Sequence, residues 1–185
     1  MQRAITALVM RFAVPLTVVA LAGGCAPKPP TAEQLAIEGR AVTDVLTQMF
    51  KAYAAKDTAG VLSTYPDSGE MMGFGTDSAE VMRSKADALA QVRADWTVMD
   101  SARVSVGEFR NLHVMVASSG DMASAAGELP MDVVAGAQRS HTLYRFGVGL
   151  RKEGGKWKIV HSVVGVATTG QSSAELVVRA RQAKR

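Results

Sequence analysis

Two residues that could transfer a proton stand on one predicted β-hairpin near the C-terminal end of the chain. His161 has an imidazole whose ordinary pKa of about 6.5 suits an acid or a base near neutral pH. Tyr144 carries a phenol that could donate a hydrogen bond to a developing oxyanion. A lone histidine on an apolar strand is also typical of a core residue whose ring bonds a backbone carbonyl. We therefore keep a catalytic and a structural interpretation of this pair.

The orientation of both side chains depends on the turn of that hairpin. Gly154 and Gly155 separate two runs of strand character, and two glycines suit a two-residue turn because both central positions need positive φ. Pairing Glu153 with Lys156 and continuing residue by residue decides which face each side chain takes. The face predicted to be covered contains Tyr144, Phe146, Val148, Leu150, Ile159, His161 and Val163. The opposite face contains Arg145, Gly147, Gly149, Val160 and Val164.

The helices expected to cover this sheet come first in the sequence. Apolar residues at helical spacing predict a long helix over residues 32–56, and Asp57 is expected to cap a short helix that ends at Ser63. A third helix is expected from about Asp77 to Trp96. The period then falls to two, which predicts strands over 104–116, 122–131, 140–152 and 156–167. This order predicts an α+β domain over residues 32–170, a cone-shaped, curved antiparallel sheet covered by about three N-terminal helices.

Side chains on the covered face could line a pocket for a small apolar ligand. We expect this pocket to be lined by Tyr53, Met82, Trp96, Phe146, Val148, Ile159 and His161. Large apolar side chains at these spacings are also typical of ordinary core packing, which would leave the cone filled. On the other face, two glycines would let another surface approach closely. A homodimer interface is therefore expected at Arg145, Gly147, Gly149, Val160 and Val164.

These features together resemble a known superfamily. The segment GEMMGFGTD and the hairpin RFGVGLRKEGGKWKIVHS, with Trp157 and His161 after the glycine turn, are similar to the SnoaL-like branch of the nuclear transport factor 2-like superfamily over residues 43–166. The hairpin is also similar to the association domain of calcium/calmodulin-dependent kinases. The resemblance implies a pocket at the wide end of the cone and dimerisation through the outer sheet face. It also implies either proton transfer by inward Asp, His or Tyr groups, or binding and assembly alone.

The N-terminal segment has the layout of a secretory signal. Arg3 and Arg11 come ahead of an apolar stretch, and the uncharged run over residues 12–27 is too short for a spanning helix, which needs about 20 apolar residues. LAGGC resembles the lipobox of bacterial lipoproteins, which implies that residues 1–24 are removed and that Cys25 is lipidated. Residues 25–31 would then be the lipid anchor and a proline-rich spacer. Because Ala26 follows the cysteine, we expect a place in the bacterial cell envelope, on the outer membrane facing the periplasm rather than on the inner membrane.

Charge and composition exclude several classes of protein. Without residues 1–24 the chain has 19 basic and 17 acidic residues, and residues 171–185 hold four of the basic residues and one acidic residue. The remaining domain is therefore close to neutral, without the basic, aromatic-rich face of a nucleic-acid binder. One cysteine and three histidines exclude a thiolate zinc cluster, and we expect no metal and no cofactor. The basic tail, residues 171–185, could contact anionic lipid headgroups or be merely solvated.

The sequence thus leaves three functions open. The first is a lipid-anchored envelope protein whose domain binds a small apolar ligand or a protein partner without catalysis. The second is a proton-transfer enzyme of the isomerase, cyclase or dehydratase type that uses His161, assisted by Tyr144. The third is a dimeric assembly module with a filled cone.

Overall fold

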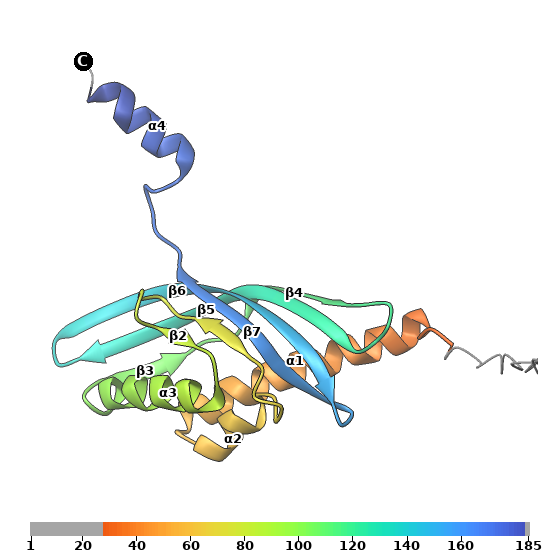
Figure 1. Ribbon diagram of the computed structural model, residues 1–185. Helices are drawn as coiled ribbons and strands as arrows, with labels where there is room; N and C mark the ends of the chain where they lie inside the picture. The colour runs from red at the N-terminus through yellow and green to blue at the C-terminus, as the bar shows by residue number, and fades with distance from the viewer. Residues whose placement is uncertain (1–27, 184–185) are drawn as a thin grey trace, which may run out of the picture.

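The computed structural model describes residues 28–183, so the predicted signal peptide and Cys25 lie outside the described residues. One curved sheet carries three helices on one side, and a fourth helix projects away on the other side (Figure 1). The helices are α1 (Ala32–Ala54), α2 (Thr58–Ser63), α3 (Lys85–Asp100) and α4 (Ser173–Gln182). The strands are β1 (Met72–Phe74), β2 (Val81–Met82), β3 (Arg103–Val106), β4 (Arg110–Val116), β5 (Met122–Ala135), β6 (Gln138–Glu153) and β7 (Lys156–Val166).

The first two helices begin where the sequence predicts. Thr31 and Gln34 form a reciprocal capping box at the start of α1, and Val42 and Leu46 are fully buried on the side that faces the sheet. The Asp57 carboxylate accepts a hydrogen bond of 3.0 Å from the backbone N–H of Gly60 and caps α2. Both predictions are confirmed.

The predicted start of the third helix is wrong. Helix α3 begins at Lys85, where the Ser84 hydroxyl accepts a hydrogen bond of 3.1 Å from the Asp87 N–H. The Glu80 carboxylate instead accepts hydrogen bonds from the backbone N–H groups of Thr76 and Asp77 and closes a turn. The capping signal read at Asp77 and Glu80 is therefore real, but it stabilises a loop ahead of β2 rather than a helix.

The sheet contains seven strands. Its order is β2-β1-β7-β6-β5-β3, and β4 also pairs with β5. The strand expected over residues 104–116 is divided into β3 and β4, which pair with successive parts of the long β5. All pairs are antiparallel except β1 with β7, which is parallel. The predicted α+β class and the curved antiparallel sheet under N-terminal helices are confirmed.

The last hairpin follows the predicted register only near its turn. Gly154 and Gly155 both have positive φ, and four pairs from Glu153 with Lys156 to Leu150 with Ile159 form as expected. Gly149 then pairs with His161 instead of Val160, so Val160 is one extra residue in β7, a β-bulge. Because side chains alternate along a strand, the bulge turns every later residue of β7 to the face opposite the predicted one.

The core lies between the helices and the covered face of the sheet. It includes Val61, Trp96, Leu150, Trp157 and Ile159, all buried. No helix of the described residues is long and apolar enough to cross a membrane.

Candidate functional site

The candidate site is built around a carboxylate on the covered side of α3. Ala88, Val92 and Trp96 form the buried face of that helix. Asp95 stands three residues after Val92, which places its carboxylate beside this apolar stripe rather than on the solvent side. The side chain is partly buried. An acid in such a position requires hydrogen-bond donors to compensate for lost water.

Two donors hold the Asp95 carboxylate. The Tyr53 hydroxyl on α1 donates a hydrogen bond of 3.0 Å to Oδ2. The Gln91 side-chain amide donates to Oδ1 at 3.0 Å and also to Oε1 of Glu80 at 3.1 Å. A single amide therefore links the two carboxylates, and both oxygens of Asp95 are engaged. Gln91 and Asp95 are four residues apart on one helix, which brings their side chains together.

Trp96 fixes the backbone of Tyr53 against α3. Its indole N–H donates a hydrogen bond of 2.9 Å to the carbonyl of Tyr53. The two aromatic rings lie 6.3 Å apart between centroids, at an interplanar angle of 48°. This contact aligns the middle of α3 with the end of α1, so the Tyr53 hydroxyl and the Asp95 carboxylate are held in place by buried groups.

Burial and nearby negative charge disfavour the ionised forms of Asp95 and of the tyrosines around it. Burial, helped by the negative charge of Glu80, raises the pKa of Asp95 above its ordinary value, although the hydrogen bonds from Tyr53 and Gln91 act in the opposite direction. Burial and the charge of Asp95 raise the pKa values of Tyr53, Tyr65 and Tyr144. Asp95 thus lies within electrostatic reach of three neutral phenols.

This arrangement can do two things chemically. A carboxyl group with a raised pKa can give or take a proton closer to neutrality than an ordinary aspartate can. The neutral phenol of Tyr144 can donate a hydrogen bond to a carbonyl or hydroxyl oxygen, whereas the single O–H of Tyr53 is already donated to Asp95. The described residues contain no group of three or more His, Cys, Asp or Glu side chains that could hold a metal ion.

The predicted pocket residues fall into two groups. Trp96, Phe146, Val148 and Ile159 are buried in the core, while Tyr53 and Met82 pack against it from partly buried positions. Phe50, Phe109 and Phe146 form a cluster of rings with centroids 5.5 to 6.2 Å apart. These contacts fill the interior at the level of Phe146. An open groove of about 490 Å³ lies elsewhere, between α1 and β4, lined by Leu35, Gly39, Leu112, Val114 and other residues.

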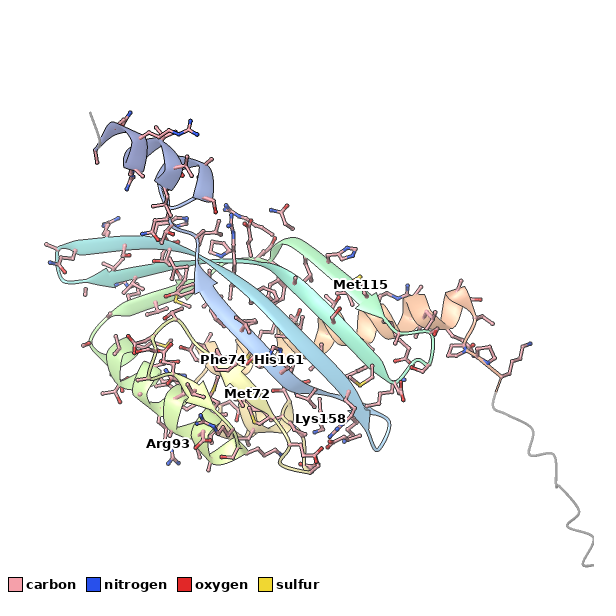
Figure 2. The ribbon with its side chains drawn as sticks, turned by 45° about the horizontal axis from the view of Figure 1, so that its top comes forward. Met72, Phe74, Arg93, Met115, Lys158 and His161 are labelled. Atoms are coloured by element: carbon pink, nitrogen blue, oxygen red, sulfur yellow. The ribbon has the colours of Figure 1, made fainter. Side chains whose placement is uncertain are left out.

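The predicted inward position of His161 is wrong. The bulge at Val160 places it opposite Gly149 on the outer face, where it is exposed and lies beside Met72 of β1 (Figure 2). His161 therefore does not share a face with Tyr144, which stays on the covered side. The same bulge turns Val164, expected at the interface, toward the core and exposes Val163.

The other predicted interface residues lie on the outer face. Arg145 donates a hydrogen bond of 3.1 Å to Glu128, and the Cβ direction of Gly147 points into open space. Gly149 pairs with His161, and Val160 occupies the bulge. Phe74 and Val163 form a neighbouring pair on this face, each 42% exposed.

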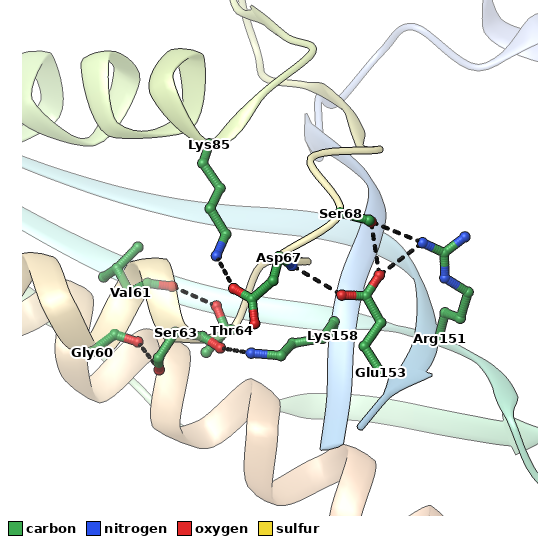
Figure 3. Close-up of polar contacts among 10 residues, drawn as sticks. All are labelled: Gly60, Val61, Ser63, Thr64, Asp67, Ser68, Lys85, Arg151, Glu153 and Lys158. Atoms are coloured by element: carbon green, nitrogen blue, oxygen red, sulfur yellow. Dashed lines mark hydrogen bonds and ion pairs between the residues drawn. The ribbon is translucent and has the colours of Figure 1, made fainter. Parts of the chain in front are cut away.

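A polar network closes the sheet edge next to α2 (Figure 3). Lys158 is buried and donates a hydrogen bond of 2.5 Å to the carbonyl of Ser63, at the end of α2. The Glu153 carboxylate accepts from Arg151 at 2.8 Å and from Ser68 at 2.8 Å. Glu153 also accepts a hydrogen bond from the Asp67 N–H, and Lys85 pairs with the Asp67 carboxylate. These contacts anchor the loop after α2, so we assign the network a structural role.

Sequence reasoning missed Asp95, Gln91 and the linking position of Glu80. The helical spacing of α3 is a signal for Asp95 but not for its partners. Asp95 falls within the stripe defined by Ala88, Val92 and Trp96, and an acid on an apolar stripe points to a special environment.

Comparison with known proteins gives a family and a fold. A model of the SnoaL-like domain matches residues 42–169. Among curated proteins, none matches. A solved NTF2-like protein of unknown function from Pseudomonas putida KT2440 is 19% identical, with a TM-score of 0.62 over 74% of this chain and 91% of that one. A ketosteroid isomerase-like protein from Erwinia carotovora atroseptica is 16% identical, with a TM-score of 0.55 over 75% and 99%. An NTF2-like protein with a cystatin-like fold from Novosphingobium aromaticivorans is 13% identical, with a TM-score of 0.61 over 80% and 92%.

Proposed function

Because the chain belongs to the family of SnoaL-like domains, we propose that it binds a small, mainly apolar molecule whose one polar oxygen lies beside Asp95. The observation that carries this proposal is the half-buried Asp95 carboxylate, held by Tyr53 and Gln91 beside the apolar core. A ligand oxygen could take a hydrogen bond from a phenol or donate one to the carboxylate. The apolar remainder would be bound by burial of surface.

The ligand would enter at the wide end of the cone. Tyr144 on β6 pairs with Val166 at the end of β7, and Val166 is 44% exposed although it is on the covered face. Deeper positions are closed by Phe146 and its aromatic neighbours. The exposed apolar surface next to Tyr144 is therefore the place where a small molecule would gain most from binding.

A second function, proton transfer, is favoured by the raised pKa of Asp95. The ionised carboxylate would take a proton from carbon next to a ligand carbonyl, and the electron pair would move onto the carbonyl oxygen. Tyr144 would donate a hydrogen bond to that oxygen, and the protonated Asp95 would return its proton. The ketosteroid isomerase-like protein has the same fold, which makes this chemistry reasonable to test here. Asp95 takes the role that the sequence suggested for His161.

One probe tests both functions. 2-Tetralone is an apolar bicyclic ketone with acidic protons on the carbon between its ring and its carbonyl group. We expect saturation-transfer NMR to detect binding, and binding to weaken severalfold in Asp95→Asn. Proton transfer would appear as protein-dependent exchange of those protons for deuterium in D₂O, lost in Asp95→Asn.

The matched control is Asp100→Asn, an exposed aspartate on the same helix. It should leave binding and exchange unchanged, as should His161→Gln. Binding without exchange would support a binding protein and reject the enzyme. Absence of binding by both wild type and variant would reject the site for this class of ligand and favour a filled assembly module.

The proposal includes a lipid anchor in the bacterial envelope. It rests on Cys25, the single cysteine, within LAGGC after an apolar segment. Cells fed an alkyne analogue of palmitate should label the wild type but not Cys25→Ser. Equal labelling of both proteins would refute the anchor, and fractionation of the labelled cells would tell the outer membrane from the inner one.

The proposal also includes a homodimer through the outer sheet face. Phe74, Val163 and Met115 expose apolar surface there, and Gly147 leaves room for close approach. Light scattering should give twice the mass of one chain, and Val163→Lys should give a monomer. A wild-type protein that is monomeric at high concentration would contradict the dimer.

A further inference from the structure

Helix α4 is the one helix of the described residues whose members are all exposed. It follows a short connection after β7 and projects from the sheet on the side opposite α2 and α3 (Figures 1 and 2). Its apolar side chains Leu176 and Val177 are 52% and 49% exposed. Among residues 28–183, no element buries the apolar side chains of this helix.

Local sequence explains why α4 forms, but not which surface its apolar side contacts. The Ser172 hydroxyl accepts a hydrogen bond of 3.2 Å from the Glu175 N–H, and the Glu175 carboxylate accepts one of 3.1 Å from the Ser172 N–H. Arg179 and Arg181 stand in the last turn, where positive charge complements the helix dipole. Helices this short are marginal in water, so a surface that buries the apolar side would stabilise α4.

The apolar side of α4 is bordered by arginines. At about 100° per residue, Leu176, Val177 and Ala180 fall within one arc of the helix. Arg179 and Arg181 fall on either side of this arc, and Val178 lies away from it. Arginines in this position can bury their carbon stems beside the apolar residues while the guanidinium groups reach anionic oxygens.

The charge of the C-terminal segment indicates which kind of surface the apolar side of α4 contacts. Residues 171–185 contain four basic residues and one acidic residue. The centre of the outer sheet face has little free negative charge to attract these basic residues. Its acidic residue Glu128 lies beside Arg110 and Arg145, whose positive charges already compensate it. A basic helix with an apolar stripe matches an anionic phospholipid surface, which supplies phosphate groups and hydrocarbon at one boundary.

We propose that α4 lies flat on a membrane that contains anionic phospholipid, with Leu176, Val177 and Ala180 inserted below the headgroups. The inference is independent of the Asp95 site. If Cys25 is lipidated, the anchor would bring α4 to such a surface, and the helix would be a second membrane contact that orients the domain.

The experiment reads α4 directly, so that binding by other parts of the chain does not affect it. In the full chain with Cys25→Ser, an NBD fluorophore is attached at Val177→Cys, within the apolar arc, or at Gln182→Cys, outside it. Each protein is mixed with vesicles of 70% phosphatidylethanolamine and 30% phosphatidylglycerol, or of pure phosphatidylcholine. We expect a blue shift and increased emission at position 177 only, and only with the anionic vesicles. Arg179→Gln with Arg181→Gln should lower partitioning about tenfold or more.

Three outcomes would overturn the proposal. The first is an unchanged spectrum at position 177 with anionic vesicles. The second is an equal change at positions 177 and 182, which would indicate non-specific adsorption. The third is a blue shift without vesicles, which would place α4 against protein. Dependence of that shift on protein concentration would identify a second copy as the occupant, and independence would identify this chain's own domain.

Discussion

The Tyr53 hydroxyl donates a hydrogen bond to Asp95 across the junction of α1 and α3, at 3.0 Å. The two residues are 42 positions apart in the sequence. Trp96, the neighbour of Asp95, returns a hydrogen bond to the backbone of Tyr53, so each helix holds the other at this point. The candidate site is therefore part of the packing between two helices, and its geometry depends on the core beneath it.

Tyr53→Phe should raise the pKa of Asp95 further. The hydrogen bond from Tyr53 stabilises the ionised carboxylate, and the variant loses it. Burial and the charge of Glu80 remain, and both favour the protonated form. Side-chain ¹³C NMR of the Asp95 carboxyl group across pH would measure the shift. Tyr144→Phe serves as control, because no hydrogen bond joins that phenol to Asp95 among the described contacts, and it should move the titration less. A titration that is unchanged or moves to lower pH in Tyr53→Phe would contradict the assigned contact.

Glu153 should make stability depend on pH in the acid range. Hydrogen bonds from Arg151 and Ser68 lower the pKa of Glu153 to about 2. The native state thus favours the ionised form, so its contribution is complete above the unfolded value of 4.5 and is lost as the pH falls toward 2. Glu153→Gln should melt a few degrees below the wild type at pH 7, and the difference should vanish at the acid end.

Thermal melts of both proteins between pH 2 and pH 7 would measure this dependence. Glu108→Gln, an exposed carboxylate outside the network of Figure 3, is the matched control and should melt like the wild type throughout. A difference between Glu153→Gln and the wild type that stays constant over the whole range would show that the carboxylate charge is not what the network uses.

The sequence predicted the elements better than it predicted their faces. Local signals were sufficient for α1, for α2 and for the hairpin turn, because caps and positive φ are decided by neighbouring residues. They were insufficient for α3, because Asp77 and Glu80 offer the same capping chemistry to a helix and to a turn. The strand that follows this turn, β2, pairs with β1, and β1 is held in the sheet by its parallel pairing with β7, which is not local.

The site was predicted less well than the fold, for two physical reasons. One extra residue in β7 reverses the alternation, and Val160 has no side-chain feature that marks it as a bulge. The predicted register therefore placed His161 inward and Val164 outward, whereas the bulge puts His161 on the outer face and Val164 against the core. Asp95 was missed because its importance comes from Tyr53 on α1 and from Glu80, in the loop ahead of β2, which Gln91 links to it; the spacing of α3 alone does not reveal these neighbours.

Deleting Val160 should destabilise the domain only modestly. In the deletion variant His161 follows Ile159 directly and still pairs with Gly149, so every later residue of β7 keeps its observed face. The loss is that of one partly buried valine side chain and should be about 1–2 kcal/mol. By contrast, His161→Gln should change the free energy of unfolding by less than about 0.5 kcal/mol, because the side chain is exposed.

Urea denaturation followed by tryptophan fluorescence would compare these two variants, since Trp96 and Trp157 are both buried. A loss of more than about 3 kcal/mol in the deletion variant would mean that the residues after Val160 do not keep their observed faces when the bulge is removed. A large loss in His161→Gln would mean that the ring is buried after all.

The two glycines of the hairpin turn should accept asparagine far better than valine. Gly154 has φ of 57° and Gly155 of 78°, and neither has a heavy atom within 4 Å of the position that a Cβ would take. Only backbone conformation therefore opposes a side chain there. Asparagine adopts left-handed φ readily, so Gly154→Asn should cost less than about 0.5 kcal/mol, whereas Gly155→Val should cost about 1–2 kcal/mol. Urea midpoints of the two variants would test this. Equal losses would indicate that contacts rather than φ constrain the turn, and the pairing of Glu153 with Lys156 would then need another cause.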